Sequence, residues 1–242
     1  MNIKSERDFI NMDDDEEFVS NIEVQIPSQP MVLNIYNVMA SAYSGINIDL
    51  DWFVESFGNT YYEPCEFPAA RVDIQHLESN SIVTMSVFSN GKLQATGGAT
   101  VAASKVSMKK LIIKLRRLGM NKAKLLNFEV HNIQAVVDAG FPINLRLLCS
   151  NYIYVDYEPE RNPGAKIRIP PDYINDKECN PEYLHKKTLA SQYNNGSKLK
   201  IEIVTLTVHF SGKIGMAGAR SINSLDKVLN YIKPYLIKSR LT

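Results

Sequence analysis

Residues 36–40 read YNVMA, and residues 131–135 read HNIQA. The two asparagines lie 132 − 37 = 95 positions apart, and the same interval separates the Tyr-Glu-Pro sequence at 62–64 from the one at 157–159. Similar stretches at a fixed spacing indicate an internal repeat. The chain of 242 residues therefore contains two related copies of one folding unit.

The later parts of the two copies match at a longer interval. The sequence SNGK at 89–92 and the sequence SGK at 211–213 lie 212 − 91 = 121 positions apart by their glycines, so the second copy contains 121 − 95 = 26 extra residues. The stretch at about 170–198 is rich in Pro, Asn, Asp and Tyr, which favour turns over regular ladders. We expect an inserted surface loop there, with repeat 1 over 31–124 and repeat 2 over 125–242.

Both copies show the same order of elements. β-Branched and alternating residues predict strands, apolar spacing predicts short helices, and the Asn-Gly and Ser-Gly pairs predict tight hairpin turns. The strands are expected over 34–42, 82–88, 129–137 and 201–208, and the short helices over 50–57 and 141–148.

A longer amphipathic helix closes each copy, and Pro234 is expected to disturb the end of the second one. Helices on one face of an antiparallel sheet leave the other face free. Two copies side by side predict an α+β fold with one continuous curved sheet.

Charge is divided unevenly along the chain. Residues 1–30 hold eight acidic and two basic side chains, a net charge of −6, so the remaining residues carry +1 − (−6) = +7. A cationic body favours a polyanionic partner such as nucleic acid. The acidic segment contains too little apolar surface to offset the entropy of ordering, so we expect a flexible tail.

The sequence contains no recognisable signature of an enzyme, a cofactor site or a membrane protein. Its three cysteines and four histidines lack metal-ligand spacing, and phosphate-loop, dinucleotide-binding and serine-hydrolase motifs do not occur. No apolar run reaches the ~18 residues of a membrane span, and the scattered cysteines fit a reducing compartment. We expect no catalytic activity, no cofactor and no metal.

The ordered set of matched motifs resembles the TATA-binding protein family from about residue 32 to about residue 238. Its carriers are the paired asparagines, the two Tyr-Glu-Pro stretches, Phe67-Pro68, residues 88–92, Thr96-Gly97, residues 141–143 and residues 211–213. The resemblance implies a TBP-like saddle of ten antiparallel strands with four helices on the convex side. It also implies a general transcription initiation factor whose concave sheet binds and bends the DNA minor groove, as this family is known to do.

The centre of such a saddle needs hydrogen-bond donors. The minor groove presents A N3 and T O2 as acceptors, nearly symmetric between A·T and T·A, so a pseudo-twofold reader needs a donor from each half. In the resemblance Asn37 and Asn132 supply these donors, with Thr96 beside the first. Ala217 occupies the place of the second threonine.

The ends of the saddle are expected to differ. Phe67 and Phe88 match the pair of apolar wedges that unstack base steps, whereas the matched positions of the second repeat are Asn162 and His209. Asparagine cannot act as an apolar wedge, and Phe210 is expected to point to the opposite face by strand alternation. We therefore expect asymmetric bending of the DNA.

Strand alternation adds further positions to the DNA-facing side. They are more polar and basic than the aliphatic residues that the family implies, which predicts a relaxed or altered preference for A·T. Lys166 and Arg168 are expected to add phosphate contacts. These further DNA-binding positions are Met39, Gln94, Gln134, Lys166, Arg168 and Thr207.

Protein partners are implied by the same resemblance. Lys105, Lys110 and Arg117 match positions where the family meets transcription factor IIA and polymerase-side regulators, and Glu158 and Glu160 match the contact for transcription factor IIB. The resemblance further implies RNA polymerase as a partner, a weak homodimer through the concave face, and action in the nucleus or in a viral transcription compartment.

Two other interpretations remain open at this point. One is a protein-interaction scaffold that kept the saddle but has weak or altered DNA bending, which Asn162 and His209 favour. The other is an appended domain of a nucleic-acid enzyme, which the end of the chain at Thr242 disfavours. Steep salt dependence of DNA binding would separate the initiation factor from the scaffold.

Overall fold

The computed structural model describes residues 31–193 and 201–241, so the expected acidic tail lies outside the described residues. Within the described part, ten strands form one antiparallel sheet in the order β2-β3-β4-β5-β1-β6-β10-β9-β8-β7. The predicted α+β fold with one continuous curved sheet is confirmed.

Each half of the sheet is built from one copy of the repeat. The first copy contains β1 (Asn34–Tyr43), α1 (Leu50–Phe57), β2 (Thr60–Tyr61), β3 (Ala69–His76), β4 (Ser81–Phe88), β5 (Lys92–Thr96) and α2 (Val101–Arg117). The second contains β6 (Leu126–Asp138), α3 (Leu145–Asn151), β7 (Val155–Asp156), β8 (Ala165–Ile169), a 3-10 turn η1 (Pro171–Tyr173), α4 (Pro181–Tyr193), β9 (Val204–Val208), β10 (Lys213–Ala219) and α5 (Ile222–Lys238).

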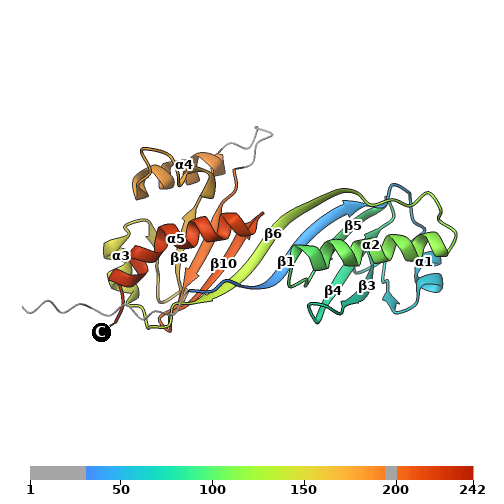
Figure 1. Ribbon diagram of the computed structural model, residues 1–242, viewed down its shortest axis with the longest axis horizontal. Helices are drawn as coiled ribbons and strands as arrows, with labels where there is room; N and C mark the ends of the chain where they lie inside the picture. The colour runs from blue at the N-terminus through green and yellow to red at the C-terminus, as the bar shows by residue number, and fades with distance from the viewer. Residues whose placement is uncertain (1–30, 194–200, 242) are drawn as a thin grey trace, which may run out of the picture.

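The two halves are joined by the first strand of each copy. Strands β1 and β6 run antiparallel and side by side between the halves (Figure 1), with Val38 opposite Ile133 and Met39 opposite Asn132. Both repeat-matched asparagines therefore lie at the middle of the sheet. This junction turns a sequence repeat into a pseudo-twofold surface.

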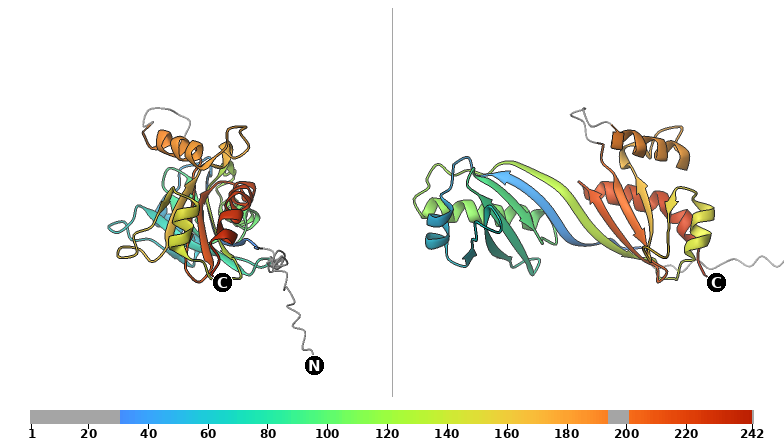
Figure 2. Two further views of the ribbon diagram at one scale, coloured as in Figure 1. Left: turned by 90° about the vertical axis from the view of Figure 1, so that its left-hand side faces the viewer. Right: turned by 180° about the vertical axis from the view of Figure 1, so that it is seen from behind.

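The helices cover one side of the sheet. Helices α2 and α5 lie on the same side (Figure 1), and the view from behind shows the strands of the other side (Figure 2). In β4 the side chains of Val83, Met85 and Val87 are fully buried, while Thr84 and Ser86 between them are half-buried. This alternation is typical of a sheet with one covered and one open face. We call the face opposite α2 and α5 the underside.

The closing helices begin with matched caps. The Thr100 hydroxyl accepts a hydrogen bond from the Ala103 amide at 3.0 Å, and the Ser221 hydroxyl accepts one from the Ser224 amide at 3.0 Å. A hydroxyl at this position satisfies a donor that the first helical turn leaves free. The two caps are 221 − 100 = 121 positions apart, the interval found for the later part of the repeat.

The prediction of a surface loop at about 170–198 was wrong in part, because η1 and α4 form there. The α4 helix makes the described part a five-helix protein rather than the expected four-helix one. Leu184 is fully buried in the core of the second half, and the His185 ring stacks on Tyr154 at 4.3 Å between centroids. Asn180 caps the helix by accepting from the Tyr183 amide at 2.8 Å.

Several other boundaries differ from the predictions. Strand β6 begins at Leu126 rather than at residue 129, and β9 begins at Val204 rather than at residue 201. The helix expected over 141–148 forms over Leu145–Asn151, because the Asn144 side chain caps it by accepting from the Leu147 amide at 3.1 Å. Helix α5 continues through Pro234 to Lys238. A proline in a helix interior removes one hydrogen bond, but the fully buried Ile232 and Leu236 on either side of it keep the helix on the sheet.

Candidate nucleic-acid interface

The centre of the underside contains two asparagines held in the same way. The Oδ1 atom of Asn37 accepts a hydrogen bond from the Gly97 amide at 2.7 Å, and the Oδ1 atom of Asn132 accepts one from the Gly218 amide at 2.7 Å. The glycines are 218 − 97 = 121 positions apart. Because a backbone N–H can only donate, the atom that faces it must be the carboxamide oxygen. Both NH2 groups are therefore left to act as donors.

Glycine is required at both of these positions. Gly97 and Gly218 have φ angles of +88° and +97°, which side chains with a Cβ atom rarely adopt. A Cβ atom would also lie 2.8 Å from the Ile82 carbonyl oxygen at the first position and 2.3 Å from the Ile203 carbonyl oxygen at the second. The paired Asn and Gly residues thus form one locally determined unit in each repeat.

Different side chains lie beside the two asparagines across the β1–β6 pair. The Asn37 Nδ2 group donates to the Gln134 Oε1 atom at 3.0 Å across the β1–β6 pair. The repeat-matched neighbour of Asn132 is Met39, which lies opposite it in the ladder. The centre is therefore symmetric in its asparagines and asymmetric in their neighbours.

The first-repeat end of the underside presents an aromatic pair. Phe67 and Phe88 are both half-buried, with ring centroids 5.9 Å apart and planes inclined by 64°. Arg71 lies over the Phe67 ring at 5.1 Å, and Lys92 lies over the Phe88 ring at 6.0 Å. Two partly exposed rings flanked by cations suit insertion between bases next to phosphates.

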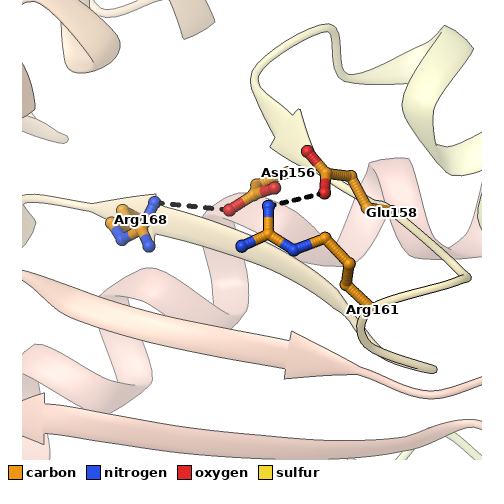
Figure 3. Close-up of polar contacts among 4 residues, drawn as sticks. All are labelled: Asp156, Glu158, Arg161 and Arg168. Carbon is orange, nitrogen blue, oxygen red and sulfur yellow. Dashed lines mark hydrogen bonds and ion pairs between the residues drawn. The ribbon is translucent and has the colours of Figure 1, made fainter.

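The second-repeat end is polar. The Asn162 Oδ1 atom accepts from the Gly164 amide at 2.9 Å, so this side chain closes a turn. Arg161 pairs with Glu158 at 2.8 Å, and Arg168 lies 3.9 Å from Asp156, as Figure 3 shows. This end therefore carries charged pairs where the first end carries two rings.

Lys166 and His209 also lie at the polar end. Lys166 pairs with Asp156 and Thr207 in the ladder, and it lines a hollow of about 210 Å³ together with Asn162. The half-buried His209 lies close to Gly164, because a Cβ atom on that glycine would meet its ring at 3.1 Å. The polar end therefore presents acidic and basic side chains together, and it has no apolar ring where the first end has two.

The remaining predicted positions follow the same alternation. Gln94 lies opposite Ser86 and Thr96 opposite Thr84, and all four are half-buried. Fully buried residues flank Thr84, Ser86 and Gln94 on both sides, and Ala95 precedes Thr96. Thr207 lies opposite Lys166 on one side and Gly215 on the other. The structure thus brings the predicted DNA-binding positions onto one sheet face and its two ends.

The predicted protein-partner positions lie elsewhere. Lys105, Lys110 and Arg117 are exposed on α2, on the covered side of the sheet, where the helix carries six exposed basic and no acidic residues. Lys110 donates to the Gln75 carbonyl at 3.4 Å. Glu158 and Glu160 are exposed in the connection between β7 and β8.

Some features of this surface escaped the sequence prediction. Ser41 and His131 form a 2.6 Å hydrogen bond across β1 and β6, and repeat matching gives no signal for it. Phe210 is 61% exposed in the turn after β9, so it does not pack into the core. The strand ends at Val208, so alternation along β9 does not determine where this ring points.

An open antiparallel face with donor amides at its centre, two rings at one end and ion-paired charges at the other fits a saddle-shaped DNA-binding protein. The model of one family, described as transcription factor TFIID (or TATA-binding protein, TBP), matches residues 32–118 and 127–239. The chain belongs to this family, and it is a divergent, DNA-binding transcription initiation factor of the TBP type.

Individual relatives show how far the likeness extends. TATA-box-binding protein 2 of Entamoeba histolytica is 28% identical over 207 residues, covering 85% of this chain and 81% of that protein. The TATA-box-binding protein of Methanothermococcus thermolithotrophicus is 31% identical over 137 residues, covering 57% of this chain and 73% of that protein.

Among solved structures, Methanococcus jannaschii TBP has the same fold with a TM-score of 0.62. It is 22% identical in sequence, and the match covers 85% of this chain and 98% of that chain. The relatives are transcription factors. In the described residues, no helix is long and apolar enough to cross a bilayer, and no three metal-binding side chains cluster together.

Proposed function

We propose that the underside binds the minor groove of A/T-rich promoter DNA and bends it, and that the bound protein recruits initiation factors and RNA polymerase in the nucleus. The observation that carries this proposal is the matched pair of Asn37 and Asn132, whose oxygens are occupied by glycine amides. Their NH2 groups are the donors that the A N3 and T O2 acceptors require.

The ends of the underside support bending that is unequal. Phe67 and Phe88 supply the apolar rings that can unstack a base step, and Asn162 and His209 supply none. Lys166 and Arg168 instead favour contact with phosphates, which adds affinity without reading sequence. The protein would therefore kink DNA at its first-repeat end and hold it electrostatically at the other.

The separation of surfaces supports simultaneous binding of DNA and proteins. The basic exposed face of α2, with Lys105, Lys110 and Arg117, lies on the side opposite the underside and suits an acidic factor of the IIA type. Glu158 and Glu160 suit a basic surface on a factor of the IIB type. Arg161, which pairs with Glu158, would have to release it or take part in that contact.

A groove-specific binding assay tests the proposal. Replacing A·T pairs by inosine·cytosine pairs changes the major groove but leaves only acceptors in the minor groove, because inosine lacks the 2-amino group of guanine. We expect the A·T and inosine·cytosine duplexes to bind alike and a G·C duplex to bind more weakly, with affinity falling steeply as salt rises. Equal binding of all three duplexes, or an affinity that does not change with salt concentration, would favour the scaffold interpretation.

A further inference from the structure

The centre of the underside contains four residues in two cross-strand rows. Asn37 lies opposite Gln134, and Met39 lies opposite Asn132. Gln134 and Met39 are themselves repeat-matched, since 134 − 39 = 95. The two asparagines therefore have different neighbours across the strands. Asn37 lies beside the carboxamide of Gln134, and Asn132 lies beside the thioether of Met39.

The hydrogen bonds in the first row fix the orientation of the Gln134 amide. The Asn37 oxygen is already bound to the Gly97 amide, so the Asn37 group that faces Gln134 is its NH2. An NH2 group can only donate, so Gln134 must present its oxygen, as the 3.0 Å Nδ2-to-Oε1 contact shows. Gln134 is half-buried, which limits its freedom to turn away.

Both members of this bond keep hydrogen-bonding capacity. A carboxamide oxygen accepts two hydrogen bonds and an NH2 group donates two, so each partner in the Asn37–Gln134 bond has one left. Each row also contains an asparagine oxygen, which faces the Gly97 or Gly218 amide in the same way. Beyond this shared oxygen the second row adds no good acceptor, because the Met39 sulfur accepts hydrogen bonds only weakly. The side that contains Gln134 thus has one more acceptor for a base than the side that contains Met39.

The minor groove contains one group that distinguishes these two sides. A·T and T·A pairs present only acceptors there, whereas a G·C pair adds the 2-amino donor of guanine. An amino group pressed against Met39 would lose its water without gaining a partner, which is costly. The same amino group near Gln134 could donate to the free lone pair of Oε1.

We infer that Gln134 lets one side of the pseudo-twofold centre accept a G·C pair, while Met39 keeps the matched position selective for A·T. This inference rests on the proposed minor-groove binding and names the base preference of that site. A mixed centre also gives the protein a direction on DNA, because a G·C pair on one flank favours one of two orientations.

Self-complementary A·T duplexes provide the test, because both orientations of the protein on them are equivalent. One G·C pair is placed at each core position in turn, and two are then placed symmetrically about the centre. Inosine·cytosine versions of the same duplexes isolate the amino group.

Wild type should bind the single G·C and inosine·cytosine duplexes alike near the centre, because the protein can turn to place Gln134 there. With two symmetric G·C pairs, one pair faces Met39 in either orientation. The affinity of wild type should therefore fall at least about fivefold relative to the duplex with two inosine·cytosine pairs.

Two variants make the result decisive. The amino-group penalty is the loss of affinity for a G·C duplex relative to the matching inosine·cytosine duplex. Gln134→Leu should show this penalty even with a single G·C pair. Met39→Gln should show no penalty even with two G·C pairs. A wild type penalised by a single G·C pair as strongly as Gln134→Leu, or a Met39→Gln variant still penalised by two, would overturn the inference. Failure of the wild type to bind the plain A·T duplex would instead overturn the proposed function.

Discussion

Replacing Asn132 by aspartate should abolish most DNA binding while leaving the fold intact. The change is isosteric, and the carboxylate keeps an oxygen for the Gly218 amide that now bonds Oδ1 at 2.7 Å. What it removes is the NH2 donor, which it replaces by a second acceptor facing the acceptors of the groove. Asn132→Asp thus separates the structural bond from the recognition bond of one residue.

The size of the effect follows from the groups involved. A base acceptor left without its donor costs about 1–3 kcal/mol, and a carboxylate among phosphates adds repulsion. We expect about 2–3 kcal/mol in total, which corresponds to about 30- to 150-fold weaker binding. Asn230→Asp is the matched control, because Asn230 is exposed on α5 and the charge change is the same.

Fluorescence anisotropy with an A/T-rich duplex at fixed salt measures the affinities of wild type, Asn132→Asp and Asn230→Asp, and urea unfolding measures their stabilities. Asn230→Asp should bind within a few fold of wild type. If Asn132→Asp bound no more weakly than Asn230→Asp, the asparagine would not read the groove. If Asn132→Asp lost several kcal/mol of stability, the bond to Gly218 would be its main role.

Four further outcomes are expected. Phe88→Ala should reduce the DNA bend measured by fluorescence transfer across the first-repeat end, and Asn162→Ala should leave the bend at the other end unchanged; an equal loss at both ends would contradict the one-sided wedge. Lys166→Gln should lower the slope of log affinity against log salt by about one, without changing sequence preference. Ser107→Ala should raise the free energy of unfolding by about 1 kcal/mol in denaturant titration, since the buried Ser107 hydroxyl has no partner in the described structure and alanine adds no volume there; a lower value would show that a partner exists. Leu184→Ala should lower that free energy by about 2–5 kcal/mol while DNA affinity per folded molecule stays constant, because Leu184 is fully buried where α4 packs on the core.

The repeat made much of the fold predictable. Matched positions such as Asn37 and Asn132 could be placed at the centre because a repeated unit must repeat its geometry, and alternation then fixed which neighbours share a face. The bonds from Gly97 and Gly218 were not predictable, since they join residues 60 and 86 positions apart. Only the folded sheet shows which end of each amide is bound to a glycine.

The insertion shows a different limit. Helix α4 has little amphipathic pattern, so hydrophobic periodicity does not reveal it, although Asn180 and Pro181 form a helix-start signal. Its stability depends on Leu184 and on the stacking of His185 with Tyr154, contacts with residues distant in sequence. Tertiary packing of this kind leaves little trace in composition, so the turn-rich insertion was interpreted as a loop.

Charge alone would also have misplaced the DNA site. The densest run of basic side chains, from Lys105 to Arg117, lies on α2 on the covered side of the sheet. The underside has fewer bases but holds the oriented amides and the Phe67–Phe88 pair. Electrostatics can attract a duplex to either surface, whereas only the underside has groups that match the edges of bases.

A crystal structure of the complex with an A/T-rich duplex tests this distinction most directly. The duplex should lie along the open sheet through its minor groove, with the Nδ2 atoms of Asn37 and Asn132 at about 3 Å from A N3 or T O2 atoms. A duplex bound along α2 instead, with the two amides facing solvent, would contradict the assignment of the DNA-binding surface.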